Sequence, residues 1–193
     1  MPIRLVVGLG NADEAYTDTP HNIGFETLDA LARQERLDWQ NVKGKVLSTV
    51  WSSSHENPER IRLIKPLSYM NVSGDSVQWA LHYWDIPSTD ILVVVDDFSI
   101  PEGQLRLRRA GRSGGHNGLQ SIIDVLQTTD FARLRIGIGP VPERMDPKDF
   151  VLKRRPRSTM ERWALRSTEA LRATLSDGLD QAMNRFNTAS PEN

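Results

Sequence analysis

The side chains with the clearest chemical potential are a histidine and a carboxylate that follow strand-like segments. His21 lies in a polar loop after the apolar segment 3–9, and Asp96 follows the most hydrophobic run of the chain, 91–95. A histidine beside a carboxylate can act as a general base near neutral pH, because the carboxylate fixes its tautomer and stabilises the imidazolium. The chain has no Cys, and we expect no serine nucleophile. Water is therefore the expected nucleophile, in a hydrolysis without a covalent intermediate.

Amide side chains are expected at the same rim, because ligands of α/β folds gather at the carboxyl ends of strands. Asn11 follows the first strand, Asn71 follows the strand that ends near residue 65, and Asn117 lies in the glycine-rich turn 114–119 with His116. Asparagines can donate to a developing oxyanion and accept from a substrate amide. Several of these residues have a plainer alternative. His21 could be a surface loop histidine, Asp96 could cap the next turn, and Asn71 could be a helix N-cap. Tyr69 could pack in the core, and His116 and Asn117 could be partners of their own turn.

Two other site classes have weak support. The four histidines, at positions 21, 55, 82 and 116, show no ligand spacing typical of a metal site, so we expect no metal. Gly8 and Gly10 begin a dinucleotide-binding fingerprint, but Asp13 stands where the third glycine belongs. We expect no cofactor.

The segments that must position these residues alternate between strands and helices. Strands are expected at 3–9, 46–51, 61–64, 91–95, 104–109 and 134–138, and helices at 23–35, up to 84, after 118, from 147, and from 158 to 186. Asn22, Asp146 and a capping box at 158–161 are the expected helix starts. The short 97–103 connection suggests an antiparallel pair. The pattern predicts one α/β domain, 1–187, with a mixed, mostly parallel central sheet covered by helices on both faces, and a frayed tail at 188–193.

Charge and hydropathy bear on partners and location. The net charge of −1 predicts no partner, yet Arg106, Arg108, Arg109 and Arg112 cluster, as do the basic residues of 153–157. Such clusters indicate either a phosphate-binding face or a solvated surface. No apolar run approaches the ~18 residues that span a bilayer, and the first apolar run is too short for a signal peptide. We expect a cytoplasmic protein without membrane contact.

Six segments, in order, resemble bacterial-type peptidyl-tRNA hydrolases and together cover about residues 3–187. They are VGLGN at 7–11, TPHNIG at 19–24 with Tyr16 ahead of it, KPLSYMNVSG at 65–74, DDFSIPEG at 96–103, GGHNGL at 114–119 and FARLRIGIG at 131–139. The resemblance implies cleavage of the ester between a peptide and the 3′ ribose of tRNA. It also implies a single α/β domain that is active as a monomer without a metal.

The resemblance further implies roles for individual residues. His21 would be the catalytic base, Asp96 would stabilise its working protonation state, and Asn11 would distinguish N-blocked from free aminoacyl-tRNA. Substrate contacts are implied, or expected beside these, at Tyr16, Tyr69, Asn71, His116 and Asn117. Basic residues against tRNA phosphates would be Arg106, Arg108 and Arg135.

The chain departs from the family pattern at positions that do not carry the chemistry. Pro20 replaces a usual Arg, Ser99 a usual acidic residue, Ala110 and Arg112 usual glycines, and Ser113 a common His. Relatives of this fold in plant organelles are RNA-splicing factors without hydrolase activity, which is the alternative function. Because His21, Asp96 and Asn11 are all present, the enzyme is favoured.

Overall fold

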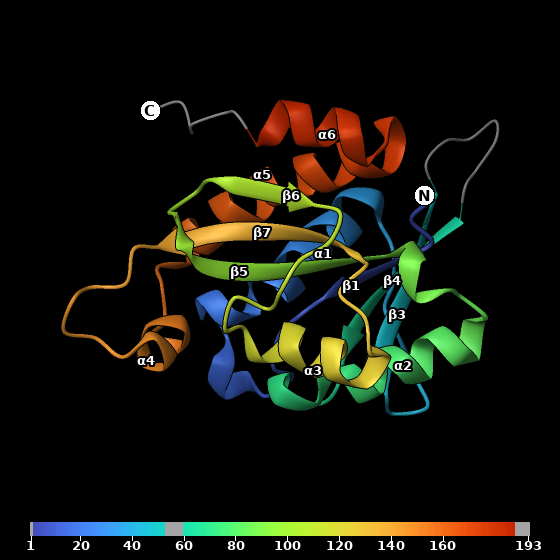
Figure 1. Cartoon of the computed structure of the whole chain (residues 1–193), viewed down its shortest axis with the longest axis horizontal. Coiled ribbons are helices and arrows are strands. Elements are labelled where there is room, and N and C mark those ends of the chain that lie inside the picture. Colours follow the sequence, from blue (N-terminus) through green and yellow to red (C-terminus); the bar gives the residue numbers. More distant parts are fainter. Residues whose placement is uncertain (1, 53–59, 188–193) are drawn as a thin grey trace.

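The computed structural model describes residues 2–52 and 60–187, which form one seven-stranded sheet between two layers of helices (Figure 1). The strand order is β2-β3-β4-β1-β5-β7-β6. The strands are β1 Leu5–Gly8, β2 Gln40–Val42, β3 Val46–Ser52, β4 Arg60–Pro66, β5 Ile91–Pro101, β6 Leu105–Arg108 and β7 Ala132–Gly139. The four central strands, from β4 to β7, are parallel, whereas β2, β3 and β6 run antiparallel to their neighbours. The predicted fold class is confirmed.

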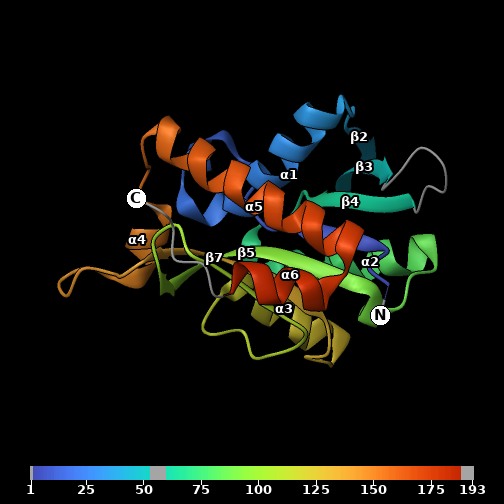
Figure 2. The same ribbon diagram turned by 90° about the horizontal axis from the view of Figure 1, so that it is seen from above.

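Helices cover both faces of this sheet. They are α1 Ile23–Glu35, α2 Ser73–Trp84, α3 Asn117–Leu126, α4 Pro147–Leu152, α5 Arg157–Asp177 and α6 Leu179–Phe186. The helices α1, α5 and α6 pack on one face, and α2 and α3 pack on the other (Figures 1 and 2). The short helix α4 lies beside the ends of β5 and β7 (Figure 1), and its Phe150 is buried in the same cluster as residues of α1 and α5.

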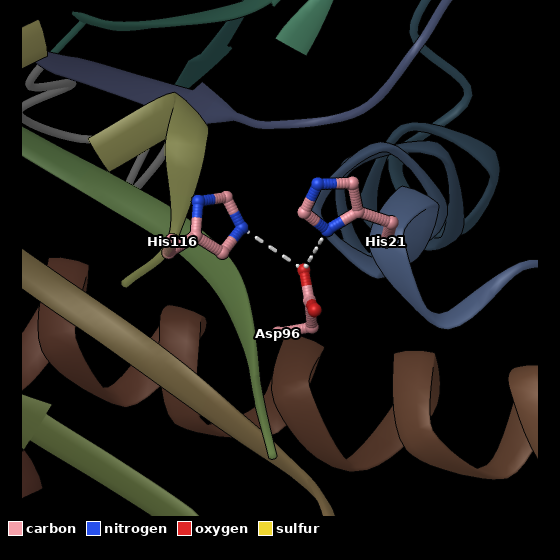
Figure 3. A group of neighbouring side chains, drawn as sticks. All are labelled: His21, Asp96 and His116. Atoms are coloured by element: carbon pink, nitrogen blue, oxygen red, sulfur yellow. Dashed lines mark hydrogen bonds and ion pairs between the residues drawn. The ribbon is translucent and has the colours of Figure 1, made fainter. Parts of the chain in front are cut away.

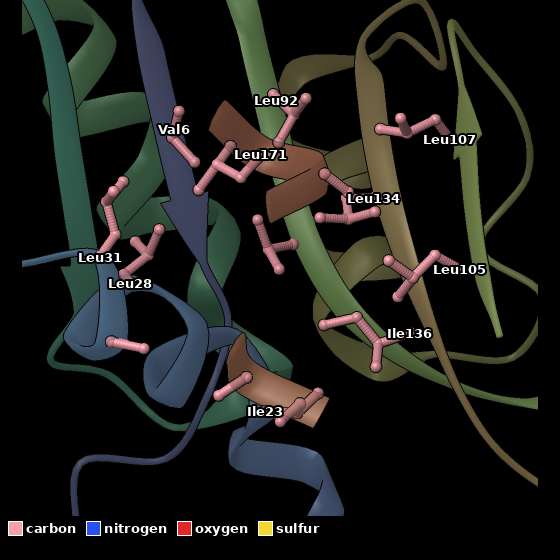
Figure 4. Packing of buried hydrophobic residues seen from close by; sticks show 14 of the residues in the cluster. Val6, Ile23, Leu28, Leu31, Leu92, Leu105, Leu107, Leu134, Ile136 and Leu171 are labelled. Atoms are coloured by element: carbon pink, nitrogen blue, oxygen red, sulfur yellow. The ribbon is translucent and has the colours of Figure 1, made fainter. Parts of the chain in front are cut away.

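The nearly continuous apolar runs of the central strands follow from burial on both faces. In β1, Val6 points to the α1/α5 layer, while its neighbours Leu5 and Val7 point to the α2/α3 layer. In β5, Leu92 and Val94 join Val6 in the first layer, where they pack with residues of α1 and α5 (Figure 4). These buried strands fix the sheet edge from which the polar loops leave.

Two strand predictions need correction. The strand expected to end at Val95 continues as β5 to Pro101, so Asp96 lies inside the strand and not after it. Its register with β7 shifts between Asp97 and Pro101, and this irregularity lets the pairing resume opposite Gly139. The antiparallel pair expected from the short 97–103 connection exists, but it joins β6 to β7, because β7 lies between β5 and β6.

The helix starts and ends also differ in part. Asp146 caps α4 as predicted, accepting from Lys148 N at 2.8 Å. The capping box at 158–161 is wrong, because Ser158 is not the N-cap: α5 begins at Arg157, after Pro156, with no side-chain cap. The C-terminal helix is broken at Gly178, whose φ of 92° a helix cannot accommodate.

Two further observations concern the chain as a whole. No helix in the described parts of the chain is long and apolar enough to cross a membrane. The predicted frayed tail, 188–193, lies outside the described residues.

Candidate active site

His21 is seated against the sheet by a close contact between the start of α1 and two strands. It lies on the 3-10 turn Pro20–Asn22, which runs directly into α1. A β-carbon at Gly24 would come within 2.5 Å of the backbone oxygens of Leu9 and Val94. Only glycine permits this approach of helix and strands, so the sequence at 24 brings the His21 turn within reach of β5.

Asp96 accepts hydrogen bonds from two histidines through a single oxygen. Its Oδ1 lies 2.9 Å from His21 Nδ1 and 3.0 Å from His116 Nε2 (Figure 3). The two imidazole rings lie 4.7 Å apart between centroids. The sequence predicted the His21–Asp96 pair but assigned His116 to substrate contact or to its own turn, so its bond to the carboxylate was missed.

The start of α3 determines the tautomer of His116, and the Asp96 carboxylate determines that of His21. His116 is the N-cap of α3, and its Nδ1 accepts from the N–H groups of Gly118 at 3.1 Å and Leu119 at 3.2 Å. The proton of neutral His116 is therefore on Nε2, which donates to Asp96. His21 then donates through Nδ1–H, and its Nε2 lone pair stays available to take a proton from water.

The electrostatics of the cluster favour this arrangement. Burial works against the charged imidazolium of His21, but the charge of Asp96 and its hydrogen bond outweigh burial and raise the pKa of His21 above its ordinary value. Burial likewise opposes the Asp96 carboxylate, but the two histidines and their hydrogen bonds hold its pKa well below the usual range. Asp96 is thus an anion at neutral pH, and it stabilises the proton that His21 gains.

The same three residues have the composition of a metal site, and their donor atoms lie within 4.8 Å of one another. Ligation by His116 Nε2 would move the ring proton to Nδ1, which already faces two backbone N–H donors. The N-cap of α3 therefore works against a metal and favours a proton-holding cluster.

The glycine turn is shaped by positive φ angles, 61° at Gly114 and 84° at Gly115. Residues 111–115 also have the order Gly-x-Ser-x-Gly, which is the order of a serine nucleophile elbow. The hydroxyl of Ser113 nevertheless donates to Gln120 Oε1 at 2.7 Å and forms no hydrogen bond with the imidazole of His21 or His116, although the Ser113 carbonyl accepts from His116 N at 3.1 Å. Without a base at its hydroxyl, Ser113 does not replace water as the nucleophile.

Two cavities meet at His21. One, of about 240 Å³, is lined by the cluster of His21, Asp96 and His116, the glycine turn and α4. The other, of about 310 Å³, is lined by the predicted contacts Asn11, Tyr16, Tyr69, Asn71 and Asn117. His21, Asn117, Lys148 and Val151 line both cavities. Sequence reasoning missed Lys148 and Val151, although the correctly predicted α4 cap at Asp146 could have pointed to the helix that carries them.

The amide of Asn11 is held in one orientation. Its Oδ1 accepts from Met70 N at 3.0 Å. The side-chain amide of Asn22 bonds the Asn11 backbone twice: its Oδ1 accepts from Asn11 N, and its Nδ2 donates to Asn11 O. The amide nitrogen of Asn11 is the end left for a ligand. Asn22 was expected to cap α1 with its side chain, and its engagement with Asn11 is the reason it does not. Asn71 is not an N-cap either, because α2 begins after Val72.

The predicted arginines lie on the sheet face next to the glycine turn. Arg106 pairs across the ladder with Arg135, and Arg108 pairs with Arg133. Arg135 forms an ion pair with Asp97, and its guanidinium lies 3.8 Å from the position of a β-carbon at Gly114. Arg133 is buried and donates to four backbone carbonyls, so it supports the loop and is no free cation.

The basic run 153–157 differs from a free phosphate-binding face. Arg157 pairs with Asp18 and Glu26. Arg155 lies over the Phe150 ring, with 4.6 Å between the guanidinium carbon and the ring centroid. Much of this run is therefore engaged with the protein itself.

The fold is of the α/β class, and an imidazole–carboxylate pair lies beside two cavities, an arrangement that can activate water for hydrolysis. The family model for peptidyl-tRNA hydrolase matches residues 5–193, and the chain belongs to this family. Peptidyl-tRNA hydrolases of Chloroflexus aggregans and Prosthecochloris aestuarii are 40% and 41% identical, covering 95% and 96% of this chain and 98% and 97% of theirs.

A solved structure extends the similarity to the fold. The crystal structure of peptidyl-tRNA hydrolase from Acinetobacter baumannii superposes with a TM-score of 0.86 at 33% identity, covering 98% of this chain and 97% of that one. The predicted family is confirmed, and the comparisons give no support to the inactive RNA-binding alternative.

Proposed function

We propose that this chain hydrolyses the ester between a peptide and the 3′ ribose of tRNA, with His21 activating the attacking water. The observation that carries the proposal is the shared Asp96 oxygen, which fixes the His21 tautomer and leaves its Nε2 free beside two cavities. Recycling of stalled peptidyl-tRNA follows from this activity.

The proposed reaction needs only water and this base. Water attacks the ester carbonyl carbon while its proton moves to His21 Nε2, and Asp96 stabilises the resulting imidazolium. The tetrahedral intermediate then expels the 3′ oxygen, which recovers the proton from His21. The products are a peptide with a free carboxylate and a tRNA with a free 3′ hydroxyl, and neither a metal nor a cofactor takes part.

Neutral amides would bind the substrate on either side of the reacting carbon. Asn117 lines both cavities, so it is placed to donate to the developing oxyanion. The free amide nitrogen of Asn11 would donate to the acyl carbonyl of an N-blocked substrate. A free aminoacyl group offers only an ammonium there, which leaves that donor unpaired and is disfavoured. Tyr16, Tyr69 and Asn71 would contact the same part of the substrate.

The tRNA would lie across the arginine face formed by Arg106, Arg108 and Arg135. Because the net charge is −1, affinity for a polyanion must come from such a local patch. Arg135 contributes less free charge than predicted, since Asp97 neutralises part of it.

We further propose that the enzyme acts as a monomer in the cytoplasm. The resemblance to bacterial-type peptidyl-tRNA hydrolases implies an active monomer, and the substrate arises where translation takes place. We propose in addition that residues 1–187 form a single peptidyl-tRNA hydrolase domain.

The test is incubation with N-acetylaminoacyl-tRNA and with free aminoacyl-tRNA, following the release of tRNA from each. Rapid turnover of the blocked substrate supports the proposal, and turnover of neither contradicts it. Ser113→Ala should keep wild-type kcat, whereas a large loss would point to a covalent serine mechanism.

A further inference from the structure

The turn that carries His21 is tied to the start of α5 by Arg157. The Nη1 atom of Arg157 lies 3.0 Å from Asp18 Oδ1 and 3.0 Å from Glu26 Oε2. Asp18 precedes His21 by three positions and Glu26 follows it by five positions. One guanidinium therefore holds the chain on both sides of the histidine.

The same turn receives two more bonds from the segment that leads into α5. Arg155 N donates to Asp18 O at 2.8 Å, and Arg154 donates to Ala15 O at 3.4 Å. Asp18 has a φ of 60°, in the left-handed region that is uncommon for non-glycine residues but that aspartate adopts more often than most. The contacts from 154–157 bond to the chain at this bend.

Within its own helix, Arg157 forms an i,i+4 ion pair with Glu161 at 3.0 Å, a kind of pair that contributes little to stability at an exposed position. Arg157 is the first residue of a 21-residue helix, where a positive charge opposes the helix dipole. Its hydrogen bonds to Glu26 and Asp18, with a further one to Glu161, raise the pKa of Arg157 above its usual range and hold it charged. Arg157 therefore places its positive charge at the unfavourable end of its own helix, and its ion pairs with Asp18 and Glu26 stabilise that charge.

We infer that Arg157 is a positioning residue for the reaction, holding the His21 turn so that the imidazole stays on Asp96. The inference rests on the proposed role of His21 as the base. It assigns the basic run 153–157 to the construction of the active site, in place of tRNA binding. Loosening the turn would weaken the His21–Asp96 bond and leave the cavities and the arginine face in place.

The test compares Arg157→Gln with Arg172→Gln, a matched control. Arg172 lies on the same helix and pairs with Glu35 at the other end of α1, and its side chain is 37% exposed against 42% for Arg157. Arg157→Gln should lower kcat about tenfold, below the 10²-fold that a 1 Å misplacement can cost, with little change in KM. Arg172→Gln should lower Tm to a similar extent and keep the wild-type kcat.

The pH profile separates positioning from simple stability. The charged and titratable groups near His21 are Asp96 on β5, His116 at the start of α3, and Asp97 and Lys148. The last two line the first cavity together with His21. If the Asp96 contact weakens, the pKa of His21 falls back towards its ordinary value, and the acid limb of kcat/KM moves to lower pH. Arg157→Lys keeps the positive charge but not the planar guanidinium that can bond two carboxylates at once. Its kcat should lie between those of Arg157→Gln and the wild type.

Equal kcat and equal acid limbs in the two glutamine variants would overturn the inference, as would a loss confined to KM. If Arg157→Gln does not fold, Asp18→Asn and Glu26→Gln each remove one of the two ion pairs of Arg157. Wild-type kcat in both of these variants would overturn the inference. An inactive wild-type enzyme would refute the proposed function instead.

Discussion

Asp96→Asn should reveal what the second histidine contributes to the site. Both rings donate to the same oxygen, Oδ1, so an asparagine with its oxygen in that place keeps both hydrogen bonds and loses only the charge. His116 enforces this orientation, because the N-cap of α3 fixes its Nε2 as a donor. The amide cannot turn its nitrogen towards the rings, and His21 keeps its working tautomer.

The size of the effect follows from the missing charge. Replacing a charge-assisted hydrogen bond with a neutral one costs about 1–1.5 kcal/mol. Loss of the Coulomb attraction to the imidazolium at about 3 Å costs at most about 5 kcal/mol with an effective dielectric constant of about 20. We expect kcat to fall roughly 10²-fold, which is about 2.7 kcal/mol.

The double variant with His116→Asn gives the decisive comparison. An asparagine at 116 can still cap α3 but no longer donates to residue 96 through an imidazole. The amide at 96 is then free to flip and favour the wrong His21 tautomer, a change that costs about 10⁴-fold in a comparable triad. Single-turnover cleavage of N-acetylaminoacyl-tRNA measures both variants. A 10⁴-fold loss in Asp96→Asn alone, unchanged in the double variant, would refute this role of His116.

The remaining predictions concern the substrate. Asn11→Ala should narrow the ratio of kcat/KM between blocked and free aminoacyl-tRNA, and an unchanged ratio would count against its role. Arg106→Ala and Arg108→Ala should raise KM for full-length tRNA, and each should reduce the slope of log affinity against log salt by about one unit, because each removes one phosphate-binding cation. Arg162→Ala, at an exposed position on α5, should do neither, and equal salt slopes in all three would show that tRNA binds elsewhere. Lys148→Gln should raise KM for the full substrate and for a short 3′ ester fragment alike, because Lys148 lines both cavities.

The sequence predicted the architecture because the central strands are buried on both faces. Apolar runs such as 91–95 have no other stable environment than a covered sheet. The same reasoning fails at the end of β5, because a polar residue after an apolar run predicts the end of a strand, whereas Asp96 is polar and buried inside β5. Hydrogen bonds from His21 and His116 stabilise the buried Asp96 carboxylate within the strand, and a local sequence pattern cannot show these partners.

The site was predicted only as far as local segments allowed. His21 and Asp96 were paired through the expectation that strand ends converge, and a family resemblance supported the pair. The bond from His116 depends on how α3 packs against the end of β5, twenty residues further along the chain. The contacts of Arg157 with Asp18 join positions 139 residues apart. Long-range contacts of this kind leave no periodic signal in the sequence, so the basic run 153–157 resembled an open surface.

The most direct test of His21 as the base is the pH dependence of kcat/KM for wild type and His21→Ala on N-acetylaminoacyl-tRNA. Only neutral His21 can accept a proton, so the wild-type rate should rise with pH through the raised pKa of His21 and then level off. His21→Ala should lose roughly 10²–10⁴-fold in kcat, and the limb due to His21 should disappear. A folded His21→Ala enzyme with near wild-type kcat, or with the same acid limb, would contradict the assignment.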